Sequence, residues 1–232
     1  LGGFHVVGAD GSVARWQSRK ARELLKILVA RRGSAVERTT LQHLLWPDLA
    51  PAQVANRFSV AATTVRRALD PSRQHPSDAF LDTAGAIVTL HISRLEVDSE
   101  QLLTAAKEAL ANAGSRPTHH RIAELQAILD LYRGEVLVDE ADAPWADRLR
   151  REVHLAHFAT AHELGRLAAE ADDQVARVGA YRAILAVDAY DLRAHEELVD
   201  ALEQLGATHQ ALEARLALQE RLDELGLDAV SH

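Results

Sequence analysis

The sequence predicts a mainly α-helical protein with a small β component, organised as two domains. Three observations lead to this prediction. Apolar residues recur at helical spacing through most of the chain, most clearly from Pro51 to Leu69. Hairpin signals occur only within about the first 95 residues. Charge divides the chain near the same place, because the first part is basic and the second part is acidic.

The charge division indicates which kind of partner each domain binds. Residues 1–96 carry 13 Lys and Arg against 8 Asp and Glu, whereas residues 97–232 carry 13 against 26. A basic domain is attracted to nucleic-acid phosphates, and an acidic domain is repelled by them. We therefore expect nucleic acid as the partner of the first domain. Protein or a small ligand is expected for the second.

Composition excludes several classes of protein. With 47% apolar residues the chain can build real cores, and it has no apolar run long enough to cross a membrane. The start, LGGFHVVGADG, lacks a charged leader and a long apolar segment, so no signal peptide is expected. Cysteine is absent, which excludes disulfides, thiolate zinc sites and cysteine nucleophiles. We expect a cytoplasmic protein without membrane association. Because the first residue is Leu, its natural N-terminus is expected to lie upstream.

The stretch Pro51–Leu69, taken as a helix at about 100° per residue, has two contrasting faces. The apolar face, expected to be buried, is Val54, Phe58, Ala61, Ala62, Val65 and Leu69. The opposite face has no acidic residue and consists of Asn56, Val60, Thr63 and Arg67, flanked by Ser59, Arg66, Arg57 and Thr64. Amide, hydroxyl, methyl and guanidinium groups suit the major groove of DNA. The alternative is a bundle helix with a solvated polar face.

The segments before this helix predict a hairpin and two shorter helices. Residues 1–7 and 12–13 flank the turn signal of residues 8–11. Ser18 caps a helix that runs to about Arg32, with a buried stripe of Ala21, Leu24, Leu25 and Leu28. Residues 35–37 form a short strand, and Thr39 with Gln42 has the spacing of a capping box that opens a helix to about Trp46.

Asp70-Pro71 is expected to end the helix, and the segment that follows completes a recognisable order of elements. Residues 80–82 and 87–91 flank Thr83-Ala84-Gly85-Ala86 and predict a second hairpin. A helix, a helix–turn–helix and then a hairpin is the order of a winged helix, in which the hairpin is the wing. Basic residues in the first turn of the helix after Ser18 are expected to face phosphate. The alternative is surface charge without function.

The motifs of the first 95 residues resemble those of one family of bacterial transcriptional activators. The motifs are LGGF at the start, SRKARELLKILVARRG from Ser18, LLWPD from Leu44 and NRFSVAATTVRRALDP from Asn56. Together they resemble the Streptomyces antibiotic regulatory protein (SARP) family, whose DNA-binding part is an OmpR-like winged helix. The resemblance departs at Thr64, where many relatives carry Arg. It implies domains at residues 1–95 and 97–232, binding of double-stranded promoter DNA at direct repeats, a homodimer on DNA, and contact with RNA polymerase.

The expected DNA contacts divide into base-facing, phosphate-contacting and wing residues. Base-facing residues are Asn56, Ser59, Val60, Thr63 and Arg67, with Arg67 as guanine reader and Asn56 as adenine reader. Phosphate-contacting residues are Arg19, Lys20, Thr39, Arg57, Thr64 and Arg66, and the wing residues are Thr83 and Gly85.

Residues 97–232 are almost wholly helical in pattern, and we expect an all-helical domain. Two sets of residues repeat at a spacing of 35, namely Leu164, Leu167, Ala176 and Tyr181, and then Val199, Leu202, Ala211 and Leu216. This is close to the period of tetratricopeptide (TPR) helix hairpins. The domain also resembles the bacterial transcriptional activation domain of the same family, where an EPW-like segment, here Ala143–Trp145, precedes a long helix.

No catalytic or metal-binding constellation is found. His154, His157 and His162 on one expected helix spread widely around its circumference, and no HExxH, Walker A, GxGxxG or GxSxG motif occurs. We expect no enzyme activity, no cofactor and no metal. The acidic residues 139–142 are either a partner surface or a solvated connection.

The sequence therefore predicts a sequence-specific DNA-binding transcriptional activator. The alternative from a different class is a protein-interaction module of a longer signalling chain, in which the winged helix no longer reads DNA. Ion pairs from Arg66 and Arg67 to acids of the second domain would favour that alternative.

Overall fold

The computed structural model describes residues 1–8, 11–112 and 116–227, which form two compact units. Unit 1 comprises Leu1–Gln101 together with Val136–Arg150. Unit 2 comprises Leu102–Glu135 and the described residues from Arg151 onward. A segment from the second half of the chain therefore folds with the first half. We call residues 136–150 the returning segment.

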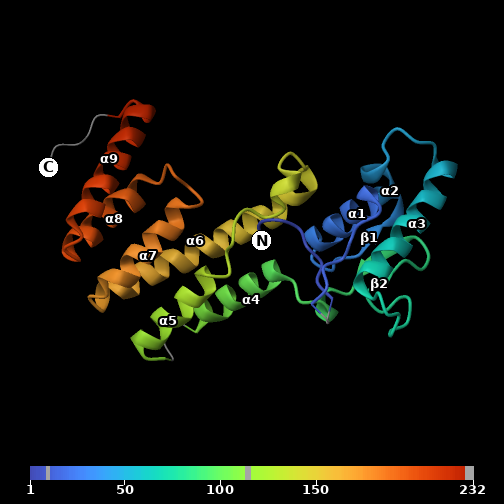
Figure 1. Ribbon diagram of the computed structural model, residues 1–232, viewed down its shortest axis with the longest axis horizontal. Helices are drawn as coiled ribbons and strands as arrows, with labels where there is room; N and C mark the ends of the chain where they lie inside the picture. The colour runs from blue at the N-terminus through green and yellow to red at the C-terminus, as the bar shows by residue number, and fades with distance from the viewer. Residues whose placement is uncertain (9–10, 113–115, 228–232) are drawn as a thin grey trace. The chain divides into compact units, whose positions relative to one another are not determined.

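Unit 1 combines helices α1, α2 and α3 with a small antiparallel sheet (Figure 1). The strand order is β1-β3-β2, with Val36 opposite Val88 and Leu81 opposite Leu90. The elements are α1 (Arg19–Ala30), β1 (Val36–Glu37), α2 (Arg38–Leu45), α3 (Pro51–Leu69), β2 (Leu81–Asp82) and β3 (Ile87–Leu90). These bounds confirm the expected helix after Ser18, the expected strand before α2 and the second hairpin.

The core of unit 1 forms where α3 packs against α1. Ser18 caps α1 through its hydroxyl, which accepts from the amide of Ala21 at 3.2 Å. The predicted stripe of α1 is buried, as are five of the six predicted apolar positions of α3. The sixth, Leu69, is only partly buried at the end of α3. Helical periodicity therefore predicted which face of α3 is turned inward and which outward.

The start of α2 and the first hairpin differ in how far they match the expectation. The capping box at Thr39 is wrong, because α2 begins at Arg38 and its N-cap, Glu37, makes no side-chain cap. Glu37 belongs to β1, and the amide of Arg38 donates to the carbonyl of Ala86, so the strand leads directly into the helix. The first hairpin is present as an antiparallel bridge between Val7 and Val13, while residues 9 and 10 of its turn lie outside the described residues.

The returning segment neutralises a buried lysine. Lys26 of α1 is only 1% exposed, and its ammonium lies 2.7 Å from a carboxylate oxygen of Asp139 and 2.8 Å from one of Glu140. Arg22, one turn earlier, pairs with Asp139 at 3.0 Å. Two acids of the stretch that we expected to be a partner surface or a solvated connection are therefore used inside unit 1.

The backbone of the returning segment is fixed at several points. The guanidinium of Arg150 donates to the carbonyls of Val136 and Glu140. Leu137 adopts a left-handed conformation with φ of 53°, which is uncommon for a residue with a branched side chain. Trp145 packs against the core of unit 1. Two 3-10 turns, Val138–Glu140 and Pro144–Ala146, lead into the helix that follows.

Unit 2 is all-helical in the described residues. Its helices are α4 (Asp98–Ala111) and α6 (Asp147–Glu170), which both begin in unit 1, and α5 (Thr118–Leu129), α7 (Gln174–Leu185), α8 (Leu192–Gln204) and α9 (Thr208–Leu225). Aspartates cap α7 and α8, since Asp173 and Asp191 accept from amides three residues on. The expected break at residues 114–117 lies partly outside the described residues, as does residue 113, the expected end of α4.

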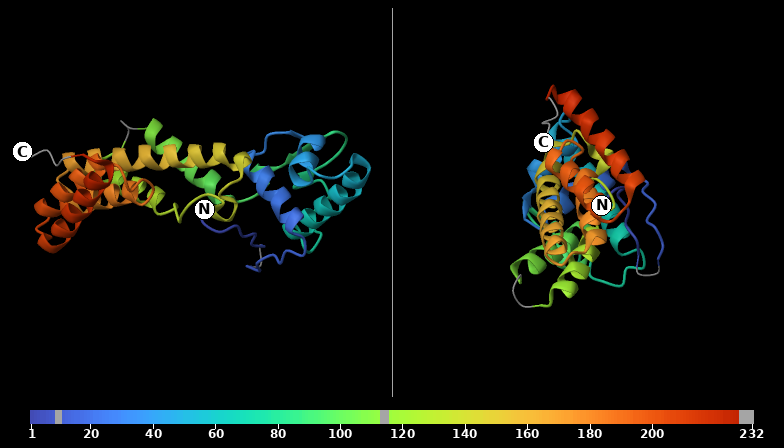
Figure 2. Two further views of the ribbon diagram at one scale, coloured as in Figure 1. Left: turned by 90° about the horizontal axis from the view of Figure 1, so that it is seen from above. Right: turned by 90° about the vertical axis from the view of Figure 1, so that its left-hand side faces the viewer.

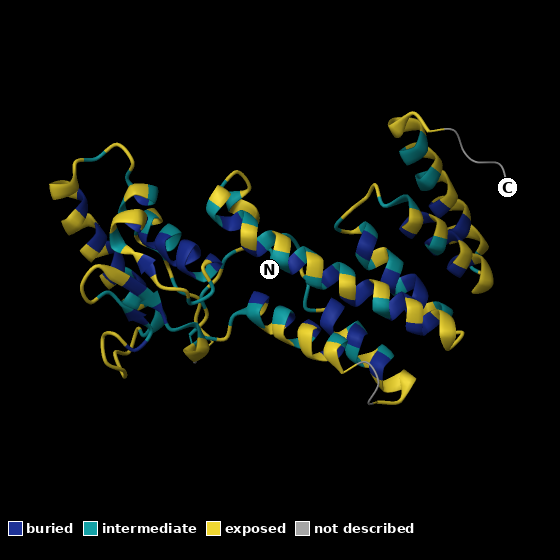
Figure 3. Cartoon of the chain, turned by 180° about the vertical axis from the view of Figure 1, so that it is seen from behind, coloured by how far each residue is buried: buried dark blue, intermediate teal, exposed yellow. Residues whose placement is uncertain are grey.

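The 35-residue repeat is only partly reflected in burial. Helices α8 and α9 lie side by side, as Figure 2 shows from two further directions. Seven of the eight repeat positions are buried or partly buried. Leu216 is 59% exposed, however, because the outer side of α9 is open along most of its length (Figure 3). None of the described helices is long and apolar enough to cross a membrane.

The buried lysine generates a stability prediction. We expect the double substitution Asp139→Asn and Glu140→Gln to lower the free energy of unfolding of unit 1 by about 2–3 kcal/mol, because it leaves a buried ammonium unpaired. Adding Lys26→Met should recover most of the loss. All three tryptophans, Trp16, Trp46 and Trp145, belong to unit 1, so tryptophan fluorescence in urea reports on this unit. Asp142→Asn, an exposed acid of the same segment, is the control. A double variant as stable as the parent would contradict this assignment.

The same contact predicts a pH dependence. Partial burial raises the pKa of Asp139, but the hydrogen bond from Lys26 and the charges of Lys26 and Arg22 outweigh it, so this pKa lies below its ordinary value of 3.8. A carboxylate with a lowered pKa stabilises the folded state above the unfolded pKa and loses this contribution as the pH falls through the folded pKa. We expect the difference in urea midpoint between parent and double variant to be constant near neutral pH and to close below about pH 4. A difference that persists in acid would contradict the ion pair.

Candidate nucleic-acid interface

The outer face of α3 is exposed and carries no acidic side chain. The five residues predicted to face bases, Asn56, Ser59, Val60, Thr63 and Arg67, are all exposed, and Val60 is 58% exposed. The neighbouring Arg57 is also exposed, whereas Thr64 and Arg66 are partly buried. The predicted exposure of this face is thus confirmed, while its contacts with DNA stay a prediction. An exposed valine surrounded by polar and cationic groups gives this face one apolar contact point.

The hydroxyl groups on this face are bonded to their own helix. Ser59 donates to the carbonyl of Ala55 at 3.1 Å, Thr63 to that of Ser59 at 2.9 Å, and Thr64 to that of Val60 at 2.9 Å. Such bonds are typical of Ser and Thr within helices. Because the hydroxyl protons are engaged, Ser59 and Thr63 offer acceptor lone pairs outward, and donation to a base requires a change of rotamer.

Three polar side chains of α3 are unengaged within the described residues. Asn56, Arg57 and Arg67 make no hydrogen bond or ion pair within the described part of the chain. An Asn amide can bond adenine bidentately, and a guanidinium can bond guanine or phosphate. These three residues therefore carry the donors that are ready to bind a partner without breaking an existing contact.

Arg66 has a different role from Arg67, although the two are adjacent. Its guanidinium donates to the carbonyl of Leu81 at 3.2 Å and to the hydroxyl of Thr83 at 2.7 Å. Arg66 thereby ties α3 to the hairpin formed by β2 and β3. The tip of this hairpin is exposed at Gly85, whose φ of 66° suits glycine. The structure thus brings together two predicted DNA-contacting residues, Arg66 and Thr83, through a direct hydrogen bond.

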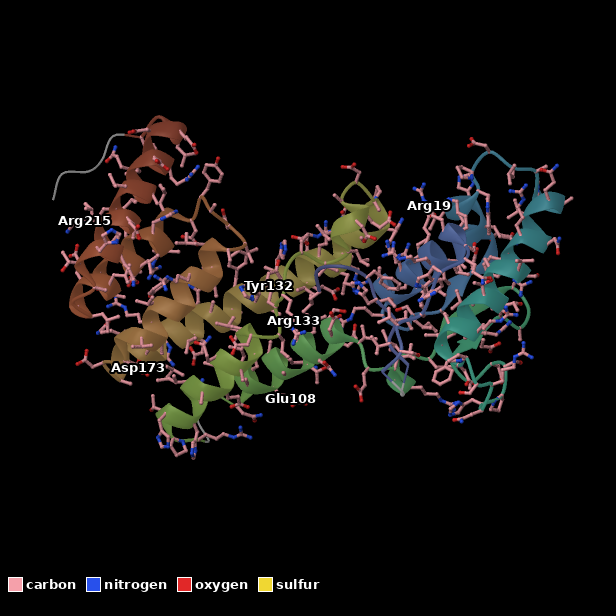
Figure 4. All side chains as sticks on the ribbon, in the orientation of Figure 1. Arg19, Glu108, Tyr132, Arg133, Asp173 and Arg215 are labelled. Atoms are coloured by element: carbon pink, nitrogen blue, oxygen red, sulfur yellow. The ribbon has the colours of Figure 1, made fainter. Side chains whose placement is uncertain are left out.

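The residues of α1 and α2 that are predicted to contact phosphate are not bonded to α3 or to the β2–β3 hairpin within the described residues. Arg19, labelled in Figure 4, is exposed in the first turn of α1, and Lys20 beside it pairs with Glu23 at 2.9 Å. Thr39 is exposed in the first turn of α2. Within the described residues, none of these three side chains forms a hydrogen bond or ion pair with α3 or with the hairpin.

The loop after α3 contains an aspartate, Asp70, whose carboxylate is held by several contacts that were not predicted from the sequence. The carboxylate of Asp70 accepts from the amides of Gln74 at 3.1 Å and His75 at 2.9 Å, and it pairs with the His75 ring at 3.4 Å. The hydrogen bond from the His75 amide is the main reason that the pKa of Asp70 is lowered. A signal was available, since an Asp side chain that follows a helix often binds nearby backbone amides. We interpreted Asp70-Pro71 only as a helix stop.

The histidines of α6 have structural surroundings. The Nε2 atom of His157 lies 2.9 Å from the carbonyl of Ala183, and burial lowers the pKa of this histidine. Its ring is tilted by 40° against that of Tyr132, labelled in Figure 4, with ring centres 4.4 Å apart. His154 pairs with Glu135 at 2.9 Å, and His162 is exposed. Within residues 1–8, 11–112 and 116–227, no three His, Asp or Glu side chains form a group that could hold a metal ion.

Comparison with known proteins finds one matching family model and a similar solved structure. Residues 97–232 match the family model of the bacterial transcriptional activator domain. The fold resembles a solved structure of Mycobacterium tuberculosis EmbR in complex with low affinity phosphopeptide, with a TM-score of 0.70 and 23% identity. The match covers 94% of this chain and 58% of that one, so the chain spans little more than half the length of the solved protein. No curated protein sequence matches the chain.

The two adjacent arginines of α3 allow a matched stability prediction. We expect Arg66→Ala to lower the free energy of unfolding of unit 1 by about 1–2 kcal/mol, because two hydrogen bonds from a charged donor are lost. Arg67→Ala should change it by less than about 0.5 kcal/mol. Tryptophan fluorescence in urea measures both variants. Equal effects of the two substitutions would show that Arg66 does not hold the hairpin.

Proposed function

The chain belongs to the bacterial transcriptional activator domain family, and we propose that it is a sequence-specific DNA-binding transcriptional activator. In this proposal unit 1 is a winged helix, α3 is its recognition helix and the β2–β3 hairpin is its wing. The binding partner in this proposal is double-stranded promoter DNA. A promoter-binding role places the protein in the cytoplasm, and it requires no catalytic step and no cofactor.

The outer face of α3 is the observation that carries the proposal. It is exposed over several turns, lacks acidic side chains, and presents one amide and two unengaged guanidinium groups around an exposed valine. An ordinary solvated helix face carries acidic as well as basic residues. A face with donors, a methyl group and positive charge matches the chemistry of the major groove, where guanine, adenine and the thymine methyl are distinguished.

The residues of this face divide between reading and positioning. Arg67 is the proposed guanine reader and Asn56 the proposed adenine reader, with Ser59, Val60 and Thr63 beside them. Arg57, with Arg19, Lys20, Thr39 and Thr64, contacts phosphate and supplies affinity that depends on salt. Arg66 also lies at the phosphate boundary, but its hydrogen bonds to Leu81 and Thr83 indicate that it sets the position of the wing.

The second half of the chain is proposed to act on protein. Residues 97–232 carry twice as many acidic as basic side chains, which disfavours contact with phosphates. By resemblance to the SARP family, we propose that two molecules bind direct repeats upstream of a promoter. The helical domain then supports the dimer and the contact with RNA polymerase.

The alternative, an interaction module that no longer reads DNA, would be favoured by ion pairs from Arg66 and Arg67 to acids of the second domain. Within the described residues of unit 1, neither side chain pairs with an acid. The Arg66 side chain bonds to the β2–β3 hairpin, and Arg67 is exposed. Within the described part of unit 1 the guanidinium of Arg67 is therefore unengaged, and this supports DNA recognition.

Binding to a selected duplex tests the proposal. The chain would first select a preferred sequence from a library of randomised duplexes, and fluorescence anisotropy would then compare that duplex with a scrambled one. We expect sequence-selective binding that weakens steeply with salt. Arg67→Ala should reduce the preference by about 1–3 kcal/mol, because a bidentate base contact is lost.

The control is Arg31→Ala, which removes an exposed arginine at the end of α1. It should leave the preference for the selected duplex unchanged. If the library yields no enriched sequence and Arg67→Ala behaves like the parent, DNA reading by α3 is wrong and the interaction module is the better description.

A further inference from the structure

A concave surface lies beside the C-terminal end of α3, and part of its lining comes from a loop that belongs neither to the proposed recognition helix nor to the wing. It has a volume of about 440 Å³, and the proposed base-facing residues Thr63 and Arg67 line one side of it. The loop between α3 and β2 lines the other side. The complete lining is Thr63, Arg66, Arg67, Asp70, Arg73, His75, Pro76, Ser77 and Phe80.

The loop is held in place by its own contacts. The Asp70 carboxylate accepts two backbone amides and pairs with His75, as described above, and the amide of Arg73 donates to the carbonyl of Asp70 at 3.2 Å. The ring of His75 lies edge-on to Phe80, with ring centres 5.1 Å apart. Arg73 itself adopts a left-handed backbone with φ of 53°. A loop with this many anchors loses little conformational entropy when it binds a partner.

The charge of this loop is available at its surface. Arg73 is exposed and makes no hydrogen bond or ion pair within the described part of the chain. Asp70, the acid nearest to it in sequence, is already engaged by two amides and an imidazole. Two unengaged guanidinium groups, those of Arg67 and Arg73, therefore line the same concavity. The lining also includes the apolar Pro76 and Phe80.

We propose that the loop of residues 70–80 is a third DNA-contacting element, in which Arg73 contacts a backbone phosphate next to the bases read by Arg67. Asp70 is a positioning residue that holds Arg73 at this place. The inference rests on the proposed function, and it extends the interface beyond the recognition helix and the wing. A guanidinium that contacts phosphate beside the base-contacting residues raises the affinity for any DNA sequence, whereas the base-contacting residues supply the preference for one sequence.

The slope of affinity against salt tests the phosphate contact. Each phosphate neutralised by a cation contributes about 0.9 to the slope of log affinity against log salt concentration. Anisotropy titrations over several salt concentrations would use a duplex selected by the parent and a scrambled duplex. We expect Arg73→Ala to lower the slope by about one for both duplexes, and Arg73→Lys to retain it. The control Arg94→Ala removes an exposed arginine outside the concavity and should leave the slope unchanged.

Two acids of the same loop provide a test in which charge and positioning predict opposite signs. Removing a negative charge near DNA strengthens binding if only electrostatics matter. Asp78 is exposed and unpaired within the described residues, so Asp78→Ala should strengthen binding slightly. Asp70→Ala releases the loop, and we expect it to weaken binding despite the same change in charge. Tryptophan fluorescence in urea verifies that unit 1 remains folded in each variant.

The outcomes separate this inference from the proposed function. A parent that prefers the selected duplex supports the function, and an unchanged slope for Arg73→Ala then overturns the loop contact alone. A parent without sequence preference overturns the function, and the slope on the scrambled duplex still decides whether Arg73 meets phosphate. Tighter binding by Asp70→Ala than by the parent overturns the positioning role. A parent that binds no duplex overturns both.

Discussion

A lysine ammonium buried on α1 is the constraint on which unit 1 depends. Lys26 lies among core residues at 1% exposure, and an unpaired charge there would cost several kcal/mol. The two carboxylates that neutralise it come from Asp139 and Glu140, more than 110 positions later in the chain. Residues 136–150 must therefore return to α1, and the bonds from Arg150 and the packing of Trp145 follow from that return. Since α3 packs on α1, the proposed reading face rests on a helix whose burial needs two parts of the chain.

The local elements could be predicted because their causes are local. Apolar spacing placed α3 at Pro51–Leu69, and the structure has the same bounds, while Ser18 was identified as the cap of α1. The returning segment could not be predicted in this way. Lys26 sits next to an apolar stripe, where a lysine ordinarily extends its charge to solvent, and nothing near it in sequence identifies its partners. The acidic residues 139–142 were noticed as a charge cluster, but a charge pattern in the sequence does not show which cation lies beside it in the fold.

At the candidate interface, too, features with local causes could be predicted and features that depend on distant residues could not. Helical phase predicted that Asn56, Val60 and Arg67 are exposed, since phase depends only on position along the helix. It did not predict that Thr63 is bonded to its own helix, or that Arg66 is committed to the hairpin while Arg67 is not. Adjacent arginines are equivalent in sequence and differ only through what the fold brings near them. For Asp70 a local signal existed, because an Asp that follows a helix often accepts from nearby backbone amides, but Asp70-Pro71 was interpreted only as a helix stop.

The central claim is that the outer face of α3, and no surface of unit 2, meets DNA. Because the chain has no cysteine, single thiols can be introduced by Val60→Cys and by Val175→Cys, at positions 58% and 68% exposed on α3 and α7. The measurement is the rate of maleimide modification of each thiol with and without the selected duplex. The account predicts that the duplex slows modification at position 60 and leaves position 175 unchanged. Unchanged modification at position 60 by a duplex that is demonstrably bound would contradict it.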